Sequence, residues 1–499
     1  MIKTKETSSY NTVLFFIGLI WLLLSVFLIG ISETFVSDMI LKFLSIETVF
    51  FFILIMYNMW KAKNGIFHIS TFFVLMMFLF LQGQVLLKAF GLTTNGLLSN
   101  NFSTNELVGG ILQVHIFIAI FMIAVALNRK SNNKKIEINI SQQVGNDQLA
   151  LKVGYLIVLC ALPFELYVNF EKLNFALTSG YASLYQEIAL NSIPSSTKIL
   201  SYFFLPGCFY VFFSSRSNSI HEKLALLLLT MHMLIELLIG YRAMAIVPML
   251  LIIYGFSEKA KHTGLKFNKK NRTRIFLLCC VVLILIIVVF PVVRATRNHG
   301  GISNLTLEEI FSIENNEIFS TINDMGKSLQ TVIYTKQLVP NSYSFRYGFT
   351  YLMNLTEAIP NLFWERHPAE VYGSLGRWLT KIVDKSFYDY GGALGYSCVA
   401  ESYINFGWIG IVFIAFMLGA IISKVENRVE KSSYAVSYAS WVIVANYLLM
   451  YPRGELSTMV RGVFWYMLIP LLFTKLLRRN IKQNVYSCCT NKESSTRLK

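Results

Sequence analysis

Long runs of apolar residues recur along the chain and are separated by short polar segments. A helix needs about 20 apolar residues to cross a hydrocarbon core of roughly 30 Å. No run alternates apolar and polar residues as a strand with two different faces does, so helices explain the pattern. The pattern predicts about twelve membrane-spanning helices, at residues 11–31, 38–60, 66–90, 107–128, 149–168, 198–214, 223–239, 243–256, 275–293, 407–423, 434–451 and 457–475.

The composition agrees with this prediction. Of 499 residues, 55% are hydrophobic and only 14% are charged, and the mean hydropathy is +0.53. These values are typical of membrane proteins and exclude an ordinary soluble domain. We therefore predict an all-α, polytopic integral membrane bundle that forms a single membrane domain over residues 1–499.

Basic residues collect in alternate loops. Residues 31–38 and 91–106 contain no lysine or arginine, whereas the loops on the other side are rich in them. Because basic loops stay in the cytoplasm, this bias predicts that both termini are cytoplasmic. The net charge of +16 is then mainly a signal of topology, and nucleic acid is not an expected partner. The basic loops contain Lys61, Lys63, Arg129, Lys130, Arg216, Lys223, Lys269, Lys270, Lys424 and Arg428.

The same rule places one large loop, residues 294–406, outside the cytoplasm. Its apolar residues recur at helical spacing between Phe319 and Ile333, which predicts an amphipathic helix that caps the bundle. Further on, aromatic residues occupy alternate positions from Tyr343 to Tyr351, with Tyr347 at the centre. These aromatics either pack at the membrane interface or form a stacking platform for sugar rings. A second outward loop, residues 170–197, contains Tyr181 and could line the same cavity.

A polar sequence leads into one of the last apolar segments. The run from Gly391 to Gly410 contains Glu401, Tyr403 and Asn405 close together. Ionisable groups at membrane depth are costly, and they usually face a cavity or a partner. Burial would raise the pKa of Glu401 towards the range of a general base, while a nearby arginine would lower it. Glu401 is therefore the main candidate for a catalytic residue.

Arginines on the predicted outer side are few. Arg242 lies in a short hairpin, Arg294 and Arg297 follow the segment 275–293, and Arg453 lies in a tight turn. The planar guanidinium group suits bidentate binding of phosphate oxygens. Arginines from separate helices at one level would hold a pyrophosphate. The alternative is that each reaches interfacial water or lipid phosphate by itself.

Motifs for metals and nucleotides are missing from the sequence. It contains no HExxH motif, P-loop or dinucleotide-binding glycine pattern, and its seven cysteines lack metal-binding spacing. We predict no cofactor and no metal.

The chain resembles the Wzy-type polymerases of O-antigen and other bacterial surface polysaccharides. The resemblance rests on the many-span bundle, the Gly240-Tyr241-Arg242 turn and the large late loop. Its most specific part is Gly395-x-Ser397-x-x-Ala400-Glu401-x-Tyr403-x-Asn405-Phe406-Gly407-x-x-Gly410.

This resemblance implies a glycosyltransferase in the bacterial inner membrane. It would join oligosaccharide repeat units carried on undecaprenyl pyrophosphate, by metal-independent glycosyl transfer at the outer leaflet. Glu401 would be the base, and Arg242 with Arg294 or Arg297 would bind the pyrophosphate. Arg453 would contact the second carrier, and the predicted substrate-binding residues are Tyr403, Asn405, Tyr347 and Tyr181. The expected partners are these lipid-linked oligosaccharides, membrane lipid and a chain-length regulator protein.

Two other functions stay open at this point. An O-antigen ligase-like enzyme would move finished glycan from the same carrier to another acceptor. A flippase or polysaccharide transporter would need inverted repeats and a polar path at the membrane midplane. The polar residues of this chain gather instead at the predicted outer face, which favours chemistry beside the membrane.

Overall fold

The computed structural model describes residues 2–32, 37–61, 68–92, 101–129, 140–179, 184, 193–262, 317–361, 364–432 and 435–480. Throughout these ranges the regular structure is helical, which confirms the predicted all-α class. The helices that carry the argument are α1 (Ile2–Ile31), α2 (Ser37–Lys61), α3 (Ile69–Leu81), α4 (Gly83–Ala89), α6 (Thr104–Asn128), α7 (Ile140–Ser179), α9 (Ser195–Ser201), α10 (Phe204–Ser214), α11 (Ile220–Ile239), α12 (Arg242–His262), α15 (Glu317–Gly326), α16 (Leu329–Leu338), α17 (Phe349–Leu355), α18 (Leu375–Val383), α19 (Lys385–Asp389), α20 (Cys398–Lys431), α21 (Ala435–Leu448) and α22 (Leu456–Arg461).

Seven helical segments in the described ranges are long and apolar enough to cross a membrane. An eighth would be formed by α3 and α4 together, which meet at a bend of 70°. The predicted segments 223–239, 243–256 and 434–451 are helical as α11, α12 and α21, although they do not meet the same criterion. The segment 275–293 lies outside the described residues, so the count of twelve spans stays a prediction, as does the orientation.

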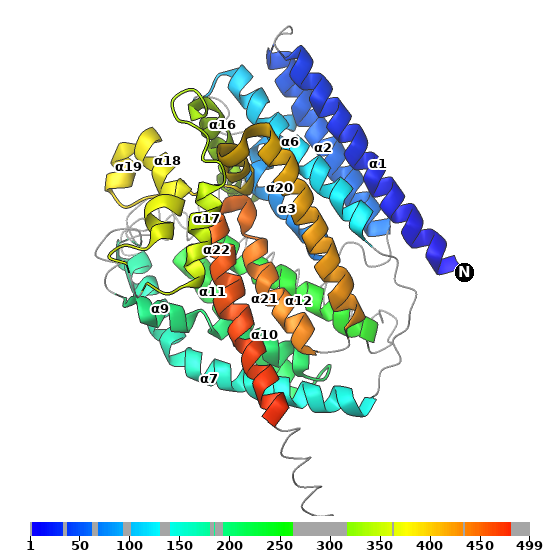
Figure 1. The fold of residues 1–499 in the computed structure, drawn as a ribbon, viewed down its shortest axis with the longest axis vertical. Helices are drawn as coiled ribbons and strands as arrows, with labels where there is room; N and C mark the ends of the chain where they lie inside the picture. The colour runs from blue at the N-terminus through cyan, green and yellow to red at the C-terminus, as the bar shows by residue number, and fades with distance from the viewer. Residues whose placement is uncertain are drawn as a thin grey trace, which may run out of the picture.

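The helix α6 lies at the centre of one half of the bundle. It packs between α1 and α20, as Figure 1 shows. Its residues are apolar on every side, which is typical of a helix that is buried all round. Close contact depends on two glycines of its neighbours. A β-carbon at Gly18 would lie 2.9 Å from the Ala119 carbonyl oxygen, and one at Gly419 would lie 2.6 Å from that of Phe121.

A second group of helices is built around α10, which packs on α7, α11 and α21. In Figure 1, α7 runs along the lower edge of the molecule, below α10. Two glycines again permit the crossing. A β-carbon at Gly154 of α7 would lie 2.8 Å from the Val211 nitrogen, and one at Gly207 of α10 would lie 2.8 Å from a Val158 side-chain carbon.

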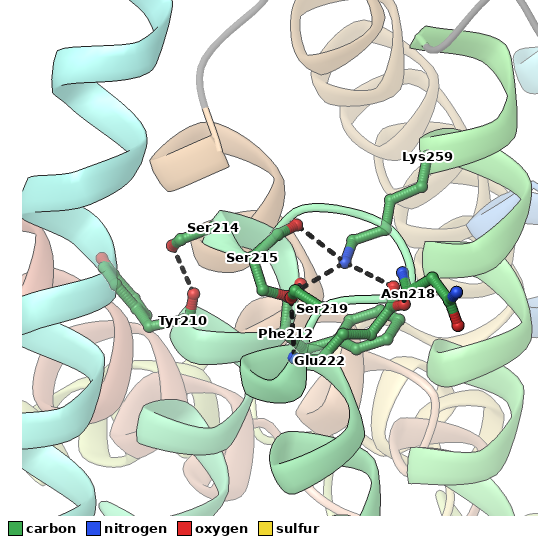
Figure 2. A network of polar contacts seen from close by, with 8 residues as sticks. All are labelled: Tyr210, Phe212, Ser214, Ser215, Asn218, Ser219, Glu222 and Lys259. Atoms are coloured by element: carbon green, nitrogen blue, oxygen red, sulfur yellow. Dashed lines mark hydrogen bonds and ion pairs between the residues drawn. The ribbon is translucent and has the colours of Figure 1, made fainter.

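A polar network joins α10, α11 and α12 at one end (Figure 2). The ammonium group of Lys259 donates to Glu222 at 2.8 Å and to the carbonyl oxygen of Ser215 at 3.2 Å. Glu222 also lies in the first turn of α11, where Ser219 caps the helix by accepting from its backbone N–H. Because the charges are paired and hydrogen-bonded, burying them between three helices is tolerated.

The large loop enters the bundle. The expected single amphipathic helix over residues 319–333 is divided into α15 and α16, and α16 packs along α6 and α20. Helix α15 crosses α4 through a pair of glycines. A β-carbon at Gly83 would lie 2.8 Å from the carbonyl oxygen of Ile322, and one at Gly326 would lie 2.6 Å from the backbone nitrogen of Gln84. The first part of the predicted loop, residues 294–316, lies outside the described residues.

Candidate functional site

Glu401 lies at the start of α20 and has no exposed surface. Three groups donate hydrogen bonds of 3.0 Å to its carboxylate. Asn354 of α17 donates through Nδ2 to Oε1, while the Tyr451 hydroxyl and the Leu456 backbone N–H both donate to Oε2. The carboxylate therefore joins three separate parts of the chain: the large loop, α20 and the turn before α22.

The beginning of α20 is suited to a carboxylate. Ser397 caps the helix by accepting a hydrogen bond from the Ala400 backbone N–H at 3.2 Å, and Thr331 of α16 donates to the same serine oxygen at 3.0 Å. Glu401 follows in the first turn. Here the unpaired backbone N–H groups and the helix dipole favour negative charge. Local helix chemistry therefore favours a carboxylate at this position.

Helix α20 is broken one turn later. Phe406 and Gly407 have non-helical backbone angles, and Gly407 has φ 61° and ψ −144°, a conformation that only glycine adopts readily. The break leaves carbonyl groups of the preceding turn available. The backbone N–H groups of Arg346 and Tyr347 donate to the carbonyl oxygens of Ile404 and Asn405, at 2.9 and 3.0 Å. The aromatic segment of the large loop is docked on α20 in this way.

Asn405 completes this docking. Its amide nitrogen donates to the Thr350 hydroxyl at 2.6 Å and to the Glu401 carbonyl at 2.8 Å, and its amide oxygen accepts from the Gly348 N–H at 3.0 Å. With its donors and its acceptor in use and no exposed surface, Asn405 holds α17 and α20 together. The predicted contact of Asn405 with substrate stays a prediction.

Three tyrosines were predicted to bind substrate, and the two that lie in the described residues differ in exposure. Tyr403 is buried, and its ring meets Phe345 and Trp408 edge-on. Tyr347 is 76% exposed and has a positive φ of 47°. Only Tyr347 therefore presents its ring at the surface. The predicted alternation of aromatics ends where α17 begins, at Phe349.

One hydrogen-bond acceptor beside Glu401 has no partner among the described residues. Asn354 is fully buried, and its side-chain oxygen accepts no hydrogen bond although its nitrogen donates to Glu401. The carboxylate itself has about four lone-pair sites, of which three accept the donors already named. The remaining lone pair of the carboxylate can therefore accept one further hydrogen bond, for example from a hydroxyl group.

The turn between α21 and α22 contributes two further charged residues. Arg453 is exposed, and its guanidinium carbon lies 5.8 Å from the centre of the Phe80 ring. Glu455 is partly buried and accepts a hydrogen bond of 2.6 Å from the Gly376 N–H, at the start of α18. Burial raises the pKa of the Glu455 carboxyl to about 7, although this hydrogen bond acts in the opposite direction. The same short turn thus contains Glu455 and donates hydrogen bonds to Glu401.

Arg242 lies at the first position of α12, two residues after Gly240, which ends α11 in a left-handed conformation. It is 7% exposed, and its guanidinium donates to Asp324 of α15 at 3.2 Å. Lys327 pairs with the same carboxylate at 2.9 Å. Arg242 therefore contacts the large loop, but it is not one of the three donors to Glu401. Arg294, Arg297 and Tyr181 lie outside the described residues.

The structure adds residues that the sequence did not single out. Asn354 and Tyr451 contact the Glu401 carboxylate, and Asp324 contacts Arg242. Tyr451 directly precedes the turn that contains Arg453, so its position next to a candidate residue was the only signal. Asn354 and Asp324 gave no signal, because a single polar residue in a short helix is common.

Comparison with known proteins gives one match. The family model described as O-antigen polysaccharide polymerase Wzy matches residues 13–484, nearly the whole chain. No curated protein sequence and no solved structure shows significant similarity to the chain. The family match agrees with the apolar helices of an integral membrane protein. The chain therefore belongs to the Wzy family of O-antigen polysaccharide polymerases.

Proposed function

We propose that this protein joins oligosaccharide repeat units carried on undecaprenyl pyrophosphate, at the outer leaflet of the bacterial inner membrane. Membership of the polymerase family supports glycosyl transfer between lipid-linked units. The bias of basic residues towards alternate loops supports twelve spans with both termini in the cytoplasm. In this orientation the large loop, Glu401 and Arg453 face the outer leaflet.

The observation that carries the proposal is the buried Glu401 carboxylate, with Asn354 beside it. An acceptor sugar must lose a hydroxyl proton as its oxygen attacks the anomeric carbon of the donor. The remaining lone pair of Glu401 is an acceptor for such a hydroxyl. In the proposed step, a bond forms between the hydroxyl oxygen and the anomeric carbon, the proton passes to Glu401, and the bond to the pyrophosphate breaks.

The leaving pyrophosphate takes the bonding electron pair and gains negative charge. Guanidinium groups that are already in place stabilise such charge without reorganisation. We assign this role to Arg242 with Arg294 or Arg297, and we assign contact with the second carrier to Arg453. Two observations support the assignment of Arg453. Its side chain is exposed, and it lies on the turn that also donates a hydrogen bond to Glu401.

The deciding experiment is the ladder of surface glycan in a strain that lacks this gene. The proposal expects glycan of a single repeat unit and loss of everything longer. Complementation with the wild-type gene should restore the ladder. Complete absence of surface glycan would point to a ligase or a flippase instead, and an unchanged ladder would exclude all three functions.

A further inference from the structure

Helix α18 of the large loop has two different faces. Leu375, Gly376, Leu379 and Thr380 are buried, whereas Arg377 and Lys381 are exposed and Trp378 is partly exposed. The buried face is held firmly. Glu455 accepts from the Gly376 N–H at 2.6 Å, and the Thr380 hydroxyl accepts from the Leu394 N–H at 2.9 Å. The outer face is therefore presented on a fixed support.

Both basic side chains of α18 and Trp378 take part in contacts with aromatic rings. The Arg346 guanidinium lies 5.8 Å from the centre of the Trp378 ring, and Tyr343 meets the same ring edge-on at 5.4 Å. The arrangement is repeated at Tyr388. Arg377 and Lys381 lie 5.6 and 5.9 Å from the centre of that ring. We call these six side chains the α18 platform: Tyr343, Arg346, Arg377, Trp378, Lys381 and Tyr388.

The α18 platform lies next to the Glu401 site. The backbone N–H of Gly376, one residue before Arg377, donates to the Glu455 carboxylate. Leu456, which follows Glu455 in the chain, donates its backbone N–H to the Glu401 carboxylate. The segment that begins the platform, with Tyr343 and Arg346, is the one docked on α20 through the Arg346 N–H. The α18 platform and Glu401 are therefore connected through the short turn that contains Glu455 and Leu456.

We propose that the α18 platform binds the sugar rings of the growing glycan. An aromatic ring offers its face to the C–H groups of a sugar, and arginine and lysine beside it donate hydrogen bonds to oxygens. Arg377 is paired with Glu370 at 3.7 Å, and Arg346 and Lys381 are further hydrogen-bond donors of the platform. Such donors suit a ligand rich in acceptor oxygens, whereas a lipid chain would need a purely apolar surface. The inference rests on the proposed function and extends it to the path of the product.

The direct test is binding of glycan without its lipid. Full-length protein in lipid nanodiscs is titrated with the strain's own surface glycan, released from the carrier by mild acid, in a calorimeter. Trp378→Ala should weaken binding by up to about tenfold, which corresponds to about 1.4 kcal/mol, because the variant removes the ring on which a sugar would stack. Trp378→Phe should bind nearly as well as wild type. Trp364→Ala, a ring of the same loop outside α18, is the matched control.

A second variant covers the case in which Trp378→Ala does not fold. Arg377→Ala with Lys381→Ala changes exposed side chains only and should weaken binding severalfold. In cells, the platform variants should shorten the glycan ladder while the first linkage between two units still forms. Binding and ladder equal to wild type in both variants would overturn the inference and leave the proposed function intact. If deletion of the whole gene left the ladder unchanged, the proposed function itself would fail.

Discussion

The side-chain nitrogen of Asn354 donates a hydrogen bond of 3.0 Å to the carboxylate of Glu401. These residues are 47 positions apart in the chain, and both are fully buried. The contact connects α17 of the large loop with the first turn of α20. It leaves the Asn354 oxygen as an acceptor beside an acid. The large loop thus completes a polar site whose acid comes from an apolar helix.

Replacing Glu401 with glutamine should abolish long-chain glycan. The amide keeps the volume of the side chain but cannot take the hydroxyl proton, so the transfer rate should fall by about 10²–10⁴. The measurement is the glycan ladder in a deletion strain complemented with the variant, with protein in the membrane quantified by immunoblot. Glu365→Gln, which changes an exposed carboxylate of the same loop, should give a wild-type ladder. A normal ladder from Glu401→Gln would refute the base role.

Replacing Arg242 with alanine should also abolish long-chain glycan. The Asp324→Asn variant tests whether the guanidinium itself or its ion pair is needed. It removes the ion pair between Arg242 and Asp324 but keeps the guanidinium that would bind pyrophosphate. Asp324→Asn should therefore retain polymer, and Arg242→Lys should retain part of it, since a lysine lacks the planar fork of donors. If Arg242→Ala and Asp324→Asn lost polymer to the same extent, and both also lost membrane-inserted protein, the two residues would form an ion pair that only stabilises the fold.

Attachment of α18 to the turn before α22 should depend on pH through Glu455. Its pKa is raised by burial from the usual 4.5 to about 7, so the folded state binds this proton more tightly than the unfolded state does. The stabilising contribution is complete below pH 4.5 and is lost as pH rises through about 7. Hydrogen exchange of the α18 backbone, corrected for intrinsic rates, should become faster as pH rises from about 5 to about 8, a range that includes the raised pKa of Glu455.

Glu455→Gln is the control for this pH effect. The amide does not ionise, so the corrected exchange of α18 should no longer change across the same interval. A pH dependence that persists in Glu455→Gln would assign the effect to another group.

Replacing Gly407 with alanine should destabilise the protein and weaken the docking of the large loop. Alanine does not adopt φ 61° with ψ −144° readily, and the strain should lower the free energy of unfolding by about 1–3 kcal/mol. Thermal unfolding of the purified protein in detergent measures this change. Gly30→Ala, at a helical position where a β-carbon would meet nothing within 4 Å, should leave the midpoint unchanged or slightly higher. Equal midpoints for the two variants would contradict the prediction.

The long apolar helices were largely predictable, since each is an apolar run of membrane length. The predicted segment 107–128 corresponds to α6 (Thr104–Asn128). The breaks were not predictable. Segment 66–90 reads as one span, yet the chain bends by 70° between α3 and α4, where α15 packs on Gly83. Hydropathy reports how apolar a segment is and says nothing about a neighbour that crosses it.

The start of α20 shows the same limit. The sequence predicted a span from residue 407, whereas α20 begins at Cys398 and contains a break at Gly407. A glycine after several polar residues indicates a helix start as readily as a break. Only the N–H groups of Arg346 and Tyr347, which satisfy the freed carbonyls, make the break stable. Those donors lie about 60 residues away in sequence, beyond the reach of any local pattern.

By itself, the sequence determined the helical membrane class, the family resemblance and the choice of Glu401, because hydropathy and a rare acid in an apolar context are local properties. The tertiary structure alone decided which groups surround that acid: Asn354, Tyr451 and the Leu456 N–H, each from a different element. It also gave Arg242 a partner in Asp324. Hydrogen bonds require particular atoms about 3 Å apart, and only the packing of distant segments brings these atoms together.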